Sequence, residues 1–192
     1  MKKIFAAIFA MMLMVGHVEA ADFTPAQVDK IFELTVNNPA VAADAALPFD
    51  AATFQQNYNA FMMNFIVDVG TGEEISVLQK IFLLNGATVT LHDEGTVFTK
   101  NFLNRAAIVG LSDSNGRLKV LNLFAVQVEG RDDALFHALI LQAFIRAVTP
   151  DFDSTSLLRA VKKNPTAPVV HNGISYTITR DENLNIVTAV AE

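Results

Sequence analysis

Cysteine and tryptophan are absent from this sequence, and histidine occurs only four times in 192 residues. A chain without cysteine has no disulfide framework, thiolate metal site, redox pair or lipid-modified cysteine. Beyond the first twenty residues, no histidine has another histidine two to four positions away. Metal sites that can be recognised in a sequence commonly pair histidines at such spacings. We therefore expect neither a metal nor a cofactor.

Clusters of positive charge are also missing. The formal net charge is -6, and beyond the N-terminus only Lys162 and Lys163 are adjacent basic residues. Nucleic-acid binding needs Lys and Arg side chains gathered against phosphates, and binding to anionic lipid needs a basic amphipathic helix. We therefore expect no nucleic-acid partner and no basic membrane-surface helix.

The first twenty residues have the three-part pattern of a secretory signal peptide. A pair of lysines precedes an apolar run over residues 4–15, and Val18 and Ala20 stand at the -3 and -1 positions of a cleavage site. The run is shorter than the roughly 20 apolar residues that a transmembrane helix needs. We expect cleavage between Ala20 and Ala21, a periplasmic or secreted protein, and no transmembrane span after cleavage.

Residues 21–48 are predicted to form an N-terminal helical arm followed by an Ala-rich linker. Thr24 is a good N-cap, Pro25 suits the first helical position, and Gln27 completes a capping box. The weakly patterned Ala-rich stretch after this helix indicates a connection. We expect residues 49–192 to form a single α+β domain.

Three further helices are predicted within that domain. Residues 51–66 carry an aromatic stripe on one side, which is typical of a helix lying on a large apolar surface. Residues 133–148 are apolar around almost the whole circumference, which is typical of a helix buried on most sides. Phe144 is expected to be its most enclosed residue. Residues 154–163 form a shorter helix.

The remaining chain has the pattern of β-hairpins. Three Asn-Gly pairs, at 85–86, 115–116 and 172–173, separate β-prone runs, and Asn-Gly supplies the positive φ angles of a type I′ turn. The predicted strands cover residues 81–84, 87–92, 97–103, 106–111, 118–128, 169–171, 174–180 and 186–190. Strands joined by short turns pair in antiparallel fashion. The fold class is therefore α+β: an antiparallel β-sheet built of hairpins, with helices packed on one face, in the order α-α-β(4-5)-α-α-β(2-3).

Three residues are candidates for contacting a ligand. Asn57 and Asn64 lie two turns apart on the flank of the aromatic stripe, as polar groups do at the edge of a ligand groove. His137 lies on the helix that is apolar all round, where an imidazole can act as a base or a switch. The alternative for all three is a structural role, with each side chain hydrogen-bonded to nearby backbone or to water.

Two other histidine positions are interpreted as turns. The His92-Asp93-Glu94 sequence combines metal-ligating and proton-transferring side chains, but it coincides with a predicted hairpin end. His171 directly precedes an Asn-Gly turn. We assign no catalytic residue and no metal ligand to the chain.

The functional hypothesis is an exported, non-catalytic binding or interaction protein of a bacterial-type cell envelope. Its partner would be a protein or a small ligand, bound at a sheet face or in a helix–sheet groove. Two alternatives stay open. The first is an extracytoplasmic hydrolase whose site is assembled from dispersed residues, since active sites are built in space. The second is a structural subunit of a homo-oligomer.

Overall fold

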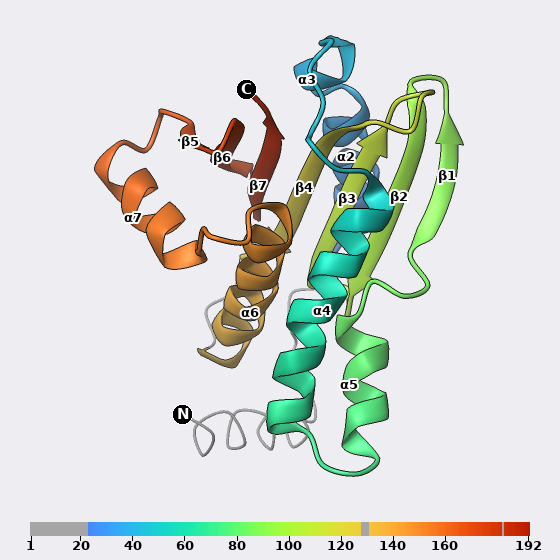
Figure 1. Cartoon of the computed structure of the whole chain (residues 1–192), viewed down its shortest axis with the longest axis vertical. Helices are drawn as coiled ribbons and strands as arrows, with labels where there is room; N and C mark the ends of the chain where they lie inside the picture. Colours follow the sequence, from blue (N-terminus) through green and yellow to red (C-terminus); the bar gives the residue numbers. More distant parts are fainter. Residues whose placement is uncertain (1–22, 128–130, 182) are drawn as a thin grey trace.

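A computed structural model describes residues 23–127, 131–181 and 183–192, without the side chains of residues 131–133. The predicted signal peptide, its cleavage site and the side chains of Asp132 and Asp133 lie outside the described residues. The fold is α+β with a seven-stranded antiparallel sheet (Figure 1). The elements in chain order are α2 (Pro25–Val36), α3 (Pro39–Ala42), α4 (Ala51–Val69), α5 (Glu74–Phe82), β1 (Thr88–His92), β2 (Gly95–Phe102), β3 (Ala106–Ser112), β4 (Leu118–Val126), α6 (Arg131–Val148), α7 (Ser154–Lys163), β5 (Val169–His171), β6 (Ile174–Asp181) and β7 (Leu184–Ala191).

The strand order across the sheet is β1-β2-β3-β4-β7-β6-β5. Each half of the sheet is a meander of sequential strands, and the two halves join where β4 pairs with β7. The Asn-Gly prediction holds best at Asn172 and Gly173, which both have positive φ angles and link β5 to β6. Gly86 and Gly116 also have positive φ angles. The turn at Gly86, however, leads from α5 into β1, and the turn at Gly116 lies in a longer loop between β3 and β4.

Helices cover both faces of the sheet, so the expectation of helices on one face was wrong. α4, α5 and α6 pack on one face, and α2 lies behind the sheet in the view of Figure 1. The cause is visible in β3 and β4. Ala106 and Ile108 belong to the core beneath α4 and α6, whereas Ala107 and Val109 belong to the core beneath α2. Strands that are apolar at successive positions must be covered on both sides.

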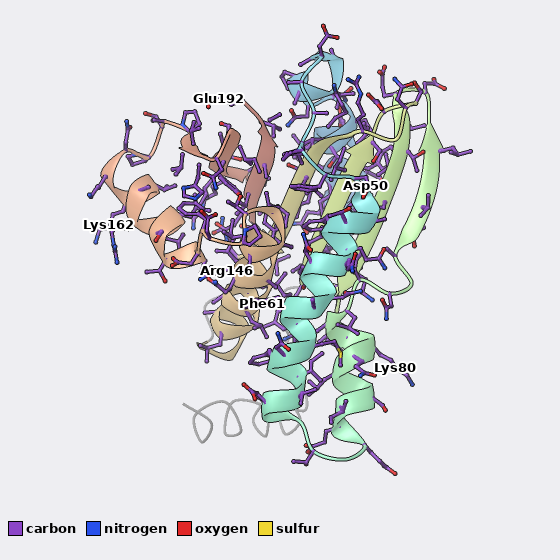
Figure 2. All side chains as sticks on the ribbon, viewed as in Figure 1. Asp50, Phe61, Lys80, Arg146, Lys162 and Glu192 are labelled. Atoms are coloured by element: carbon purple, nitrogen blue, oxygen red, sulfur yellow. The ribbon has the colours of Figure 1, made fainter. Side chains whose placement is uncertain are left out.

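The larger core lies between α4, α6 and the sheet. Asp50 stands at the start of α4 (Figure 2). Its carboxylate caps the helix by accepting a hydrogen bond from the backbone N–H of Thr53 at 2.7 Å. From α4, Phe54 meets Phe144 of α6 edge-on, with their ring centroids 6.0 Å apart. Phe144 is fully buried, as expected from the sequence. Aromatic pairs in this arrangement contribute stability beyond their buried area.

The smaller core is sealed by α2. Thr24 and Gln27 form the predicted capping box. At the other end of the helix, the side-chain Nδ2 of Asn122 donates to the Thr35 hydroxyl at 3.0 Å, and the Thr188 hydroxyl donates to the side-chain Oδ1 of Asn122 at 2.7 Å. Buried polar groups are costly unless satisfied, and this chain of hydrogen bonds fixes α2 against β4 and β7.

Residues 74–82 are helical, which corrects the prediction of a strand at 81–84. α5 presents Ile75, Leu78 and Phe82 to the larger core, a spacing that matches one side of a helix. The Glu74 carboxylate accepts hydrogen bonds from the amide and hydroxyl of Thr71 at the start of α5.

In the described part of the chain, no helix combines the length and apolarity needed to cross a bilayer.

Candidate functional site

An apolar pocket of about 300 Å³ lies between α6, α7 and the sheet. Its floor comes from three neighbouring strands of the sheet, and its walls come from the two helices. Aliphatic side chains dominate, and the two exceptions are a histidine and an asparagine. The lining residues are Leu123, Ala125, Ala134, His137, Ala138, Leu141, Leu158, Ile178, Asn185 and Val187.

Strand register explains the floor. Leu123, Val187 and Ile178 form one row across β4, β7 and β6. Two residues nearer the start of β7, and therefore on the same face, Ala125 is paired with Asn185, and Asn185 is paired with Arg180. Side chains in one row share a face of the sheet. Arg180, which is exposed, therefore stands on the pocket's face beside Asn185.

The α6 wall follows from helical spacing. Ala134, Ala138 and Leu141 recur at intervals of four and three residues, so they lie on one side of the helix. The two alanines leave space that larger side chains would fill. His137 borders this stripe, with its ring centroid 5.7 Å from that of Phe136 and its Nε2 atom shielded from solvent.

The α7 wall is held in place at its N-terminus. The Asp153 carboxylate caps α7 by accepting a hydrogen bond from the Ser156 amide at 2.7 Å, and this bond lowers the pKa of Asp153. The side-chain oxygen of Gln142 on α6 accepts a hydrogen bond from the Ser154 amide at 3.0 Å. Leu158 stays half exposed at the pocket. The two helices are thus tied together next to the cavity that they enclose.

The turn between α6 and α7 is also tied to the β5–β6 turn. His171 stacks on Phe152 with ring centroids 4.5 Å apart and planes inclined by 12°. The Nε2 atom of His171 lies 3.3 Å from a carboxylate oxygen of Asp151. Both carboxylate oxygens of Asp151 accept hydrogen bonds from the side-chain Nδ2 of Asn172. The hydrogen bonds from the Asn172 side chain lower the pKa of Asp151 most, and His171 lowers it further by a smaller amount. His171 flanks its turn as expected, but it is half-buried there and contacts a second turn.

The three residues proposed from the sequence do not come together. His137 lines the pocket. Asn57 lies on α4, and its side-chain Nδ2 donates to the backbone carbonyl oxygen of Ala147 on α6 at 3.4 Å. Asn64 is exposed on α4. Neither Asn57 nor Asn64 borders the pocket. The sequence pattern did not point to Asn185 and Arg180, because their positions on one face depend on strand pairing.

The His92-Asp93-Glu94 turn is exposed between β1 and β2. The Glu94 amide donates to Nδ1 of His92 at 3.3 Å, and the imidazole meets Phe32 of α2 edge-on. Over the ranges that the structure describes, no three His, Cys, Asp or Glu side chains are grouped closely enough to hold a metal ion.

A second hollow, of about 270 Å³, lies between the start of α4 and the β1–β2 hairpin. Ala52 and Gln55 of α4 border it on one side, and Val89 and Phe98 border it on the other. It holds no titratable side chain among the described residues that line it.

Searches for a matching family model, a similar curated protein or a similar solved structure returned no match for this chain.

Proposed function

We propose that the chain is an exported, non-catalytic binding protein that holds a small apolar carboxylate in the pocket between α6 and α7. The observation that carries this proposal is the pocket itself, which combines aliphatic walls with two polar side chains. Ligand sites are typically apolar hollows with a few placed polar groups. His137 is the one titratable side chain among the described lining residues, and this favours binding over a hydrolase site built around it.

The size of the pocket favours a small ligand. Ligand pockets generally range from about 300 to 1,000 Å³, and this pocket is at the lower end. Leu123, Leu141 and Val187 would contact the apolar part of the ligand. Burying apolar surface there contributes roughly 25 cal/mol for each Å² removed from water.

The polar side chains favour an anionic group on that ligand. Asn185 offers an amide donor at the floor, and Arg180 is its cross-strand neighbour on the same face, within reach of a ligand that extends from the pocket. Arg180 has no ion pair with any residue that the structure describes. Guanidinium groups bind carboxylates through paired, charge-assisted hydrogen bonds. An aliphatic chain lying over the floor would thus place its carboxylate at Arg180 and Asn185.

Export is supported by the N-terminal sequence alone. The lysine pair, the apolar run and the small residues Val18 and Ala20 follow the order of a cleavable secretory signal. The protein would then act in the periplasm or outside the cell. N-terminal sequencing of protein recovered from either place tests this part of the proposal, and the first residue should be Ala21.

Isothermal titration with octanoate and 1-octanol tests the binding proposal. We expect octanoate to bind more tightly than the alcohol, because only the carboxylate pairs with Arg180. Ala138→Phe should weaken both ligands about tenfold or more, since the new ring fills the cavity, a loss of about 1.4 kcal/mol. Arg180→Gln should remove the preference for the carboxylate and leave octanol binding unchanged.

Ala52→Phe is the matched control, because it places the same ring in the hollow beside α4. It should leave octanoate binding as in the natural chain. Failure of octanoate to bind, or binding that is insensitive to Ala138→Phe, would show that the pocket does not have this function.

A further inference from the structure

The strand β1 forms an unprotected edge of the sheet. Within the part of the chain that the structure describes, only β2 pairs with it, and all five of its residues are exposed. Val89 is 63% exposed and Leu91 is 84% exposed. Proteins usually protect edge strands with charges, proline, bulges or short length. β1 carries no lysine, carboxylate or proline, whereas the opposite edge, β5, is only three residues long.

The free side of β1 presents regularly spaced backbone groups. The two-residue turn Asp93-Glu94 closes the hairpin, so the pair His92 and Gly95 exchanges its hydrogen bonds across that hairpin. Bonding alternates along a strand, so Thr90 also bonds to β2. The N–H and C=O groups of Val89 and Leu91 therefore point away from the sheet and are available to another strand.

We propose that a second copy of this chain occupies this edge, with the two β1 strands pairing in antiparallel fashion about Thr90. This register places Val89 opposite the partner's Leu91, so the outward-facing backbone groups of both residues meet in hydrogen-bonded pairs. The interface is isologous, since each strand contributes the same surface. The two sheets then continue into each other, and the most exposed apolar side chains of β1 cover one another.

Charge complementarity selects the antiparallel arrangement. Asp93 and Glu94 lie at one end of β1 and are exposed. Lys100 lies at the other end, where its Nζ donates to the carbonyl oxygens of Lys80 and Asn85 at 3.4 and 3.3 Å. Antiparallel pairing brings each acidic turn to the partner's basic end. Parallel pairing would instead place the two acidic turns together.

The hollow beside α4 adds an apolar surface to this interface. Strand register places Val89 on the same face as Phe98, and both border the hollow. The partner's Leu91, opposite Val89, would stand at its edge on the same face. The dimer thus removes from water the apolar surface that the hairpin exposes alone. This inference does not depend on the proposed ligand.

Because the chain has no cysteine, one introduced cysteine can report the register. At the two-fold axis Thr90 faces its own copy in a non-hydrogen-bonded pair, with Cα atoms about 4.5 Å apart, within the range of a disulfide. We expect Thr90→Cys to form a covalent dimer on mild oxidation. Thr88→Cys is the matched control. Its copies would lie four residues apart along the strands, about 14 Å at 3.4 Å per residue, and should not cross-link.

Light scattering over a concentration series measures the association of the natural chain. We expect a dimer that weakens as salt rises, since the charges at the strand ends are screened. Leu91→Lys should give a folded monomer, whereas Val67→Lys, at a 60% exposed position near the end of α4, should leave the dimer intact. A natural chain that stays monomeric, equal cross-linking of both cysteine variants, or a dimer that does not cross-link at Thr90 would each overturn the proposal.

Discussion

The two tyrosines of the chain are both buried, but their hydroxyl groups have different surroundings. The hydroxyl of Tyr176 is hydrogen-bonded to the Thr149 hydroxyl. The hydroxyl of Tyr58 is buried among aromatic rings, and no described residue hydrogen-bonds to it. A buried polar group without a partner destabilises the fold, whereas a paired one does not.

Replacing each tyrosine with phenylalanine should therefore have opposite effects. Tyr58→Phe should raise the free energy of unfolding by about 1 kcal/mol, because it removes an unsatisfied hydroxyl. Tyr176→Phe should lower it by about 1–2 kcal/mol, because the Thr149 hydroxyl loses its partner. Urea titrations of the two variants measure both changes. A clear loss of stability in Tyr58→Phe would indicate a partner for that hydroxyl, such as a buried water.

Sequence reasoning reached part of the candidate site. His137 stands out in sequence because most of the residues around it on its helix are apolar, and it does line the pocket. Arg180 and Asn185 have no such signal. They share a face only because β6 pairs with β7 in one register, and a shift of one residue would send Asn185 to the other face. Tertiary pairing of this kind cannot be deduced from local pattern.

At the scale of elements, helices and strands with strong local signals were predicted closely. α7 has the expected bounds, and α4 and α6 differ from prediction only at their ends. The error at 81–84 arose because a short apolar run before Asn-Gly fits a strand or a helix end equally well. The helical cover on the second face of the sheet was predictable in principle, since β3 is apolar at nearly every position.

The arm of residues 21–48 should be needed for the stability of the domain. α2 covers Val109, Leu111 and Phe124, and the arm also supplies the Ala43 carbonyl oxygen that accepts a hydrogen bond from the buried Lys119. A chain beginning at residue 49 would expose this apolar face. Lys119 would lose the Ala43 carbonyl oxygen, and Asn122 would lose the Thr35 hydroxyl.

We expect the truncated chain to melt at a lower temperature than the full chain, to bind an apolar dye and to aggregate. Thermal melts and dye fluorescence of the two chains measure this. A truncated chain that stays soluble, binds no dye and melts like the longer one would show that the α2 core contributes little.

For the whole molecule, the buried tyrosines predict loss of stability in alkali. Burial raises the pKa of Tyr176 to about 12, and it raises the pKa of Tyr58 well above its ordinary value. In the unfolded chain both ionise near pH 10. Above pH 10 the unfolded state therefore loses protons that the folded state retains, and the free energy of unfolding falls. The stability that comes from keeping both buried tyrosines protonated is fully present below pH 10. The share due to Tyr176 is lost as pH rises to about 12.

Each tyrosine that remains protonated should contribute a fall of about 1.4 kcal/mol per pH unit in this window. The sequence has only these two tyrosines and no tryptophan. The ultraviolet signal of tyrosinate should therefore appear together with global unfolding, as followed by circular dichroism. Ionisation near pH 10 while the circular dichroism stays native would contradict the burial of at least one ring.

The strand order has a consequence for how the chain is made. β7 is the last strand in the sequence, yet it lies between β4 and β6. Until Leu184–Ala191 has left the ribosome, β4 lacks a neighbour on one side and the two meanders have no ladder between them. Contacts between segments distant in sequence form slowly. The seven-stranded sheet therefore cannot close until β7 has emerged, although six of its strands precede β7 in the sequence.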